Sequence, residues 1–159
     1  VTDTEEEVTS SKENITGPNV MALERRSRVA NAVQEMLDAS EKIEGGIGER
    51  VREIAQNQNQ IHENMEMNLE KIKNQNRFFR FLFGSKAKDV EELKNQIKTN
   101  QEKIVELKNT VGEMTDEQVK ARLETQINTL EQVKTQIETE TIEETSDFSL
   151  FGWVKNLFK

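Results

Sequence analysis

A series of residues, apolar at every position but one, constrains this chain more than any other feature. The series covers residues 90–114, and its spacing alternates between three and four without a break. Its members are Val90, Leu93, Ile97, Asn100, Ile104, Leu107, Val111 and Met114. This is the a and d pattern of a heptad repeat, which places one apolar stripe along an α-helix. A chain with such a stripe has to bury it against another helix.

Two further segments carry helical stripes, one from Val29 to Phe83 and one from Val119 to Ile137. With 7 Gly and 1 Pro in 159 residues, the many tight turns of a β-sandwich or barrel are not expected. Only 33% of the residues are hydrophobic, which suits long helices that each bury one narrow stripe. We predict an all-α fold: an elongated antiparallel helical hairpin or coiled-coil bundle of three to four long helices, with a short C-terminal amphipathic helix.

Glycines and capping signals divide the helical part. Three Gly between residues 45 and 48 cost about 2–3 kcal/mol of helix propensity relative to Ala, so we predict a hinge over residues 44–50. A phosphate-binding glycine loop is not favoured there, because no strand precedes it. Turns are predicted near Gly84 and over residues 112–115, where Thr115 and Gln118 match a capping box. The predicted helices cover residues 19–43, 48–82, 86–112, 116–143 and 147–158.

Three parts follow from this division: a disordered acidic tail over 1–18, a coiled-coil bundle over 19–143 and an aromatic amphipathic helix over 144–159. The tail carries five acidic residues and one Lys, unlike the basic and apolar start of a signal peptide. Short connections predict antiparallel neighbours. Helix 19–43 either joins the bundle as a fourth helix or projects to meet another copy, and the sequence leaves both open.

All eight aromatic residues fall in two short segments, 78–83 and 148–158. Six basic residues and no acidic one lie between Glu70 and Asp89, although the chain has a net charge of −8. The second segment predicts a helix that Ser146 caps. We predict that both segments contact a partner or a membrane. The residues expected at this contact are Arg77, Phe78, Phe79, Arg80, Phe81, Leu82, Phe83, Lys86, Lys88, Phe148, Leu150, Phe151, Trp153, Val154, Leu157 and Phe158.

Aromatic side chains interleaved with Arg and Lys suit an anionic membrane, a single-stranded nucleic acid or an acidic, apolar pocket of a protein. Nucleic acid is the least expected of these, since the acidic remainder of the chain would repel it. A purely structural alternative is a hydrophobic plug that closes the end of the hairpin.

The predicted turns also bring the two aromatic segments together. Two reversals of direction return residues 143–147 to residues 82–88, so both segments are expected at one end of the bundle. There the acidic residues Glu138, Glu140, Glu143 and Glu144 are expected to face the basic residues Arg77, Arg80, Lys86 and Lys88.

Little in the composition supports catalysis. The lack of Cys excludes thiolate sites, and a single His argues against a His-rich metal centre or a Ser-His-Asp triad, so we expect no enzyme, no metal and no cofactor. His62 is predicted to be exposed to solvent, as is the acidic stretch 138–147. We interpret the amides of Asn57, Asn59, Asn64, Asn68 and Asn74 as a solvated face, with an oligomer interface as the alternative. The spacing of 18 between Ser40, Gln58 and Asn76 is interpreted as chance, with buried polar layers as the alternative.

These observations favour a structural or assembly protein. We expect it to associate with itself or to dock into a larger complex through residues 77–83 and 148–158. The alternative is a peripheral membrane protein that the same segments anchor to an anionic lipid surface. The expected location is the cytoplasm, either free or at the membrane surface. The sequence identifies neither the partner nor the stoichiometry.

Overall fold

The computed structural model describes residues 18–74 and 85–145. Four helices account for this part of the chain: α1 (Pro18–Ser40), α2 (Gly46–Asn74), α4 (Ser85–Gly112) and α5 (Glu117–Thr145). The prediction of an all-α fold is therefore confirmed. The predicted helix over 147–158, the stretch 75–84 and the acidic tail lie outside the described residues, except that Pro18 begins α1.

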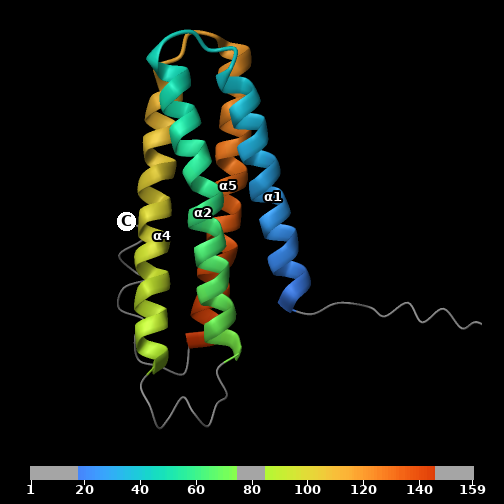
Figure 1. The fold of residues 1–159 in the computed structure, drawn as a ribbon, viewed down its shortest axis with the longest axis vertical. Helices are drawn as coiled ribbons and strands as arrows, with labels where there is room; N and C mark the ends of the chain where they lie inside the picture. Colours follow the sequence, from blue (N-terminus) through green and yellow to red (C-terminus); the bar gives the residue numbers. More distant parts are fainter. Residues whose placement is uncertain (1–17, 75–84, 146–159) are drawn as a thin grey trace, which may run out of the picture.

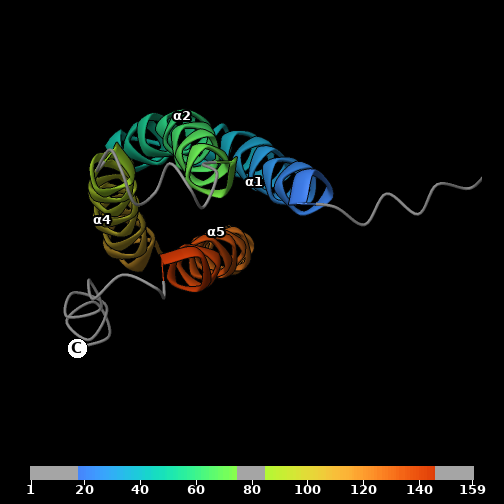
Figure 2. The same cartoon turned by 90° about the horizontal axis from the view of Figure 1, so that it is seen from below.

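The four helices lie side by side, and consecutive helices run in opposite directions (Figure 1). Seen from below, α1 lies next to α2 and α5, and α4 lies next to the same two helices (Figure 2). α2 and α5 also contact each other across the bundle. Helix α1 is thus a fourth member of the bundle, the first of the two possibilities that the sequence leaves open.

The predicted hinge is a full reversal of the chain. α1 ends at Ser40 and α2 begins at Gly46, and between them Gly45 has a positive φ of 81°. The backbone N–H of Ile43 donates to the carbonyl of Ser40 at 3.2 Å, which closes the turn. A left-handed conformation is the one that Gly adopts without strain. The cluster of glycines therefore provides a tight turn that folds α1 back onto α2.

The turn between α4 and α5 begins at Gly112, where the sequence predicts the end of a helix. The capping box predicted at Thr115 is wrong by one residue. Asp116 is the N-cap, since its Oδ1 accepts hydrogen bonds from the backbone N–H groups of Gln118 at 3.0 Å and Val119 at 3.1 Å. Thr115 and Asp116 are both residue types that favour this position, and the backbone path selects Asp116.

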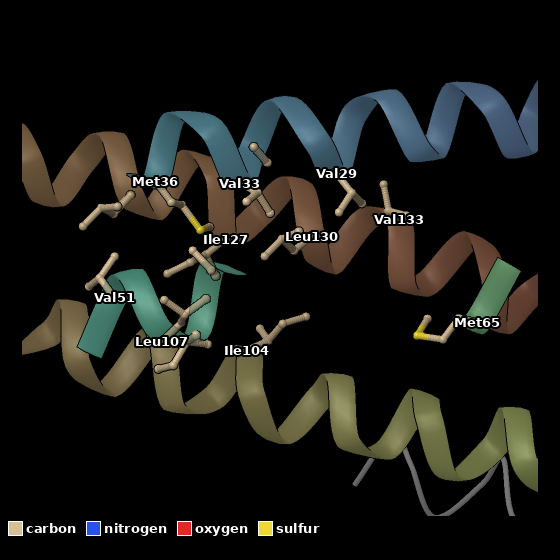
Figure 3. Close-up of a cluster of buried hydrophobic side chains, with 14 of the residues drawn as sticks. Val29, Val33, Met36, Val51, Met65, Ile104, Leu107, Ile127, Leu130 and Val133 are labelled. Carbon is tan, nitrogen blue, oxygen red and sulfur yellow. The ribbon is translucent and has the colours of Figure 1, made fainter. Parts of the chain in front are cut away.

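The core runs along the whole bundle as one continuous cluster of apolar side chains. Every apolar member of the stripe over 90–114 is buried, and so are the stripe residues of α5 from Val119 to Ile137. Figure 3 shows Met36 and Val33 of α1 beside Ile127 and Leu130 of α5. Each helix thus buries the narrow stripe that its spacing predicts.

The helix ends to which the two aromatic segments are attached lie at one end of the bundle. The end of α2 at Asn74, the start of α4 at Ser85 and the end of α5 at Thr145 all lie at the lower end in Figure 1. The segments 75–84 and 146–159 are attached there. The opposite end carries the two described turns, from Ser40 to Gly46 and from Gly112 to Glu117.

Candidate functional site

Most of the residues predicted to make external contacts lie outside the described part of the chain. These are Arg77 to Phe83 and all those from Phe148 to Phe158. Lys86 and Lys88 belong to the first turn of α4, and the side chain of Lys88 is exposed. The described helices bring the attachment points of the two segments to one end of the bundle. They do not place the aromatic side chains themselves.

The acidic end of α5 is only partly the solvated stretch that we predict from the sequence: Glu143 is exposed, whereas Glu138 and Glu140 are not. Glu138 is buried and accepts a hydrogen bond from Lys134 at 3.2 Å. Glu140 is half-buried, and its described partners are Arg25 of α1 and Lys73 of α2. The predicted partners Arg77, Arg80 and Lys86 have no described side chains. In the described bundle, Glu140 thus binds cations of α1 and α2.

Arg25 is the centre of a buried ionic cluster near this end. Its Nε and Nη2 donate to the two carboxylate oxygens of Glu66 at 2.6 and 2.8 Å, a bidentate arrangement. Its Nη1 donates to Glu140, which also accepts from Lys73. The side chain of Arg25 is 3% exposed and that of Glu66 is 0% exposed. Bidentate pairing and a second carboxylate are what a guanidinium needs in order to be buried.

The cluster alters the pKa values of its members. Burial alone would lower the pKa of Arg25, but the bonds and charges of Glu66 and Glu140 outweigh burial and raise it. Burial would likewise raise the pKa of Glu140, yet Lys73 and Arg25 hold it below its ordinary value. The arrangement therefore keeps Arg25 and Glu140 charged. Since their charges cancel, the cluster needs no bound ion for neutrality.

The prediction that His62 is exposed to solvent is wrong, because its side chain is 5% exposed. It lies one turn before Glu66 on α2, with Nε2 3.3 Å from Oε1 of Glu66 but without a hydrogen bond. Burial lowers the pKa of His62 to about 4, and the charges of Arg25 and Arg26 act in the same direction. His62 is therefore a neutral, buried imidazole at neutral pH.

A second polar layer lies between α2 and α4. Asn100 donates through Nδ2 to Oε1 of Gln58 at 2.7 Å, and both side chains are buried. Further along α2, toward its C-terminal end, Asn68 is also buried and donates to Gln96 of α4 at 3.0 Å. Gln58 and Ser40 are both buried polar residues, which favours buried polar layers over chance for these two positions, and Asn76 lies outside the described residues. Asn68 is likewise not part of a solvated face.

The described surface includes two hollows over contacts between the helices. One of about 360 Å³ lies over the α1–α2 contact, lined by Arg26, Asn59 and His62 among others. The other, of about 300 Å³, lies between the two turns, lined by Ile43, Met114 and neighbouring residues. Within residues 18–74 and 85–145, no group of three or more acidic or His side chains is placed to hold a metal ion.

The sequence carries a signal for the ionic cluster, although the prediction above missed it. On α1 the spacing from Ala22 to Arg25 to Val29 is three and four, which puts Arg25 on the buried stripe. A charged residue at a stripe position needs an opposite charge on a neighbouring helix. That signal names the position but not the partner.

A scan against protein-family models found no matching family, and searches of the curated proteins and of the solved structures found no match either. None of the described helices has an apolar stretch long enough to cross a lipid bilayer.

Proposed function

We propose that this chain is a non-enzymatic assembly protein that docks through one end of its helical bundle. The contacts are made by residues 77–83 and 148–158, either with further copies of the chain or within a larger complex. One observation carries the proposal: α2 ends, α4 begins and α5 ends at the same end of the bundle, so both aromatic segments are attached there. Two apolar segments tethered side by side can act as a single contact surface.

The described surface supports this choice of contact region. Among the residues whose exposure is described, only four large hydrophobic side chains are exposed, and they are spread over three helices: Met21, Leu23, Met67 and Val105. Scattered apolar residues of this kind are usual on a protein surface and do not mark an interface. A strong apolar contact therefore has to come from the eight aromatic residues of the two segments.

We also infer that the helices pack as an antiparallel coiled coil. The support is the unbroken spacing of three and four over residues 90–114, together with the burial of its apolar members. In a coiled coil, such residues insert between four residues of the facing helix. A rigid, elongated rod of this kind would hold the docking end at a fixed distance from its opposite end.

The proposal is tested by sedimentation analysis of the full chain over a range of concentrations. We expect association that Phe79→Ser with Phe81→Ser weakens, and that Trp153→Ser with Phe158→Ser weakens as well. The control is Met67→Ser with Val105→Ser, which removes two exposed apolar residues from the sides of the bundle. A second measurement is the set of proteins that are cross-linked to the chain in its native cells. Docking through this end would be refuted if neither aromatic variant changes self-association or this set of proteins.

A lipid surface is the second candidate, because six basic residues surround the first aromatic segment. Cations beside aromatic side chains bind anionic headgroups. Flotation with anionic vesicles and with neutral vesicles separates this candidate from protein docking. Flotation with anionic vesicles only, lost in the aromatic variants, would support the lipid candidate, and no flotation at low salt would remove it.

A further inference from the structure

Helix α1 can leave the bundle without separating the other three helices. It packs against α2 and α5, as α4 does, and α2, α4 and α5 each contact one another. Toward Pro18, α1 leans away from the other helices (Figures 1 and 2). Undocking of α1 therefore leaves three helices in mutual contact.

The apolar contact of α1 is also the weakest of the four. Its buried hydrophobic residues are Ala22, Val29, Ala32, Val33, Met36 and Ala39. Half of these are Ala, which has little apolar area to bury, and Met36 is the only large one. α4 and α5 instead bury mainly Ile, Leu and Val. Polar bonds therefore contribute a larger share of the packing energy for α1 than for α4 or α5.

These polar bonds form two groups. Arg28 and Glu35 bind Gln132, Gln136 and Arg122 of α5, and a second group surrounds Arg25, next to His62, the only His of the chain. Arg25 joins α1 to Glu66 of α2 and to Glu140 of α5, which Lys73 of α2 also contacts. Arg26, the second cation of α1, binds Glu63 at 3.0 Å and Glu70 at 3.4 Å on α2.

His62 lies inside this arrangement. The charged groups near it are Arg25 and Arg26 from α1 and Glu66 and Glu63 from its own helix, and Glu140 of α5 and Lys73 of α2 are joined to it through Arg25. The polar contacts of α4 with this stretch of α2 include those of the uncharged Gln96 and Asn100.

We propose that α1 is an acid-released helix whose docking depends on an uncharged His62. Protonation adds a buried positive charge near Arg25 and Arg26, where both oxygens of the nearest carboxylate, Glu66, already accept hydrogen bonds from Arg25. Release of α1 returns all three groups to water, and it uncovers the apolar stripes of α2 and α5 that α1 covers. The bundle of α2, α4 and α5 stays together. This inference does not rest on the docking end proposed above.

The size of the effect follows from linkage. The pKa of His62 is about 4 when α1 is docked, and exposure on release would restore the ordinary value of 6.5. The released form therefore binds the proton more tightly, and acid favours it. Between pH 7.5 and pH 5.0 the ratio of released to docked chains is expected to rise about 30-fold.

Spin labels can measure this release, because the chain has no Cys of its own. Met21→Cys with Val105→Cys places one label on α1 and one on α4, at exposed positions. Met67→Cys with Val105→Cys is the matched control, with labels on α2 and α4. We expect the distances of the first pair, measured by pulsed electron spin resonance, to lengthen and broaden reversibly at pH 5.0. Those of the control pair should not change.

His62→Gln in both labelled chains removes the titrating group and should keep α1 docked at pH 5.0. Three results would overturn the proposal: the first pair is unaffected by acid, both pairs broaden together, or the Gln variant releases α1 as readily. The first two results use the native His62. They decide the matter even if the Gln variant does not fold.

Discussion

Replacement of Gly48 by Ala tests the close packing at the turn between α1 and α2. A Cβ at this position would lie 2.7 Å from the carbonyl oxygen of Ile43 and 2.8 Å from that of Ser40. Ordinary contact begins at 3.4 Å, so these carbonyls would have to retreat by about 0.7 Å in a closely packed region. Both are backbone atoms, which cannot rotate away as a flexible side chain can.

The expected cost is a balance of opposing effects. Crowding of this kind costs about 1–3 kcal/mol. The Ser40 carbonyl also accepts the hydrogen bond from Ile43, and weakening it adds up to about 1 kcal/mol. Ala is better than Gly in a helix by about 1 kcal/mol, which offsets part of this. We therefore expect Gly48→Ala to lower the free energy of unfolding by about 1–2 kcal/mol, although the same change in an open helix would raise it.

Urea denaturation followed by circular dichroism measures this change, with Gly46→Ala as the control. A Cβ at Gly46 meets no atom within 4 Å, and Gly46 has no positive φ. The control should change the free energy of unfolding by less than about 0.5 kcal/mol, as surface changes usually do. A Gly48→Ala protein as stable as the native chain would show that α1 does not fold back through the turn described above.

Three further predictions concern the core and its charges. Asn100→Leu should lower the free energy of unfolding by about 1–3 kcal/mol, because it leaves the buried amide of Gln58 without its partner. The double variant Gln58→Leu with Asn100→Leu should have a free energy of unfolding within about 1 kcal/mol of that of the native chain. Met36→Ala should cost about 2–5 kcal/mol in denaturant unfolding, and Met67→Ala, with its exposed side chain, less than about 0.5 kcal/mol. The unfolded chain binds a proton at His62 near pH 6.5 and the folded chain only near pH 4, so stability should fall by up to about 3 kcal/mol as the pH drops through this range, and His62→Gln should lose this dependence.

The sequence predicts the helices well because their signals are local. The stripe residues from Val90 to Val111 and from Val119 to Ile137 recur at the helical period, and the folded chain buries them. A period of this kind shows which face of a helix is apolar without any knowledge of its neighbours. The end of α4 follows in the same way from Gly112.

The place of α1 could not be predicted, because it depends on the path of only five residues between Ser40 and Gly46. Gly is compatible both with a kinked continuation of the helix and with a reversal. Only the packing of the whole bundle selects the reversal. The same reason applies to the cap of α5, where two adjacent residues offer equivalent side-chain oxygens.

The burial of His62, Arg25 and Glu66 could not be predicted from residue type. Charged residues are almost never fully buried unless they are paired, so exposure was the better expectation for each residue taken alone. The pairs that allow burial join Arg25 to residues 41 and 115 positions away in the chain. Such distances are beyond any local pattern.

The bundle contains two buried polar layers, the Arg25 cluster and the pair of Gln58 and Asn100, and their positions suggest what they contribute. Buried ion pairs and amides contribute little net stability compared with apolar residues of the same size, but they can fix the register of a helix. The small Ala and Val side chains of α1 would tolerate a slide of one turn along α2 and α5. Such a slide would move Arg25 about 5.4 Å away from Glu66 and Glu140, and would leave the buried charges of Arg25 and Glu66 without their ion-pair partner. The Arg25 cluster therefore sets the register of α1, and the bond between Gln58 and Asn100 does the same for α2 and α4.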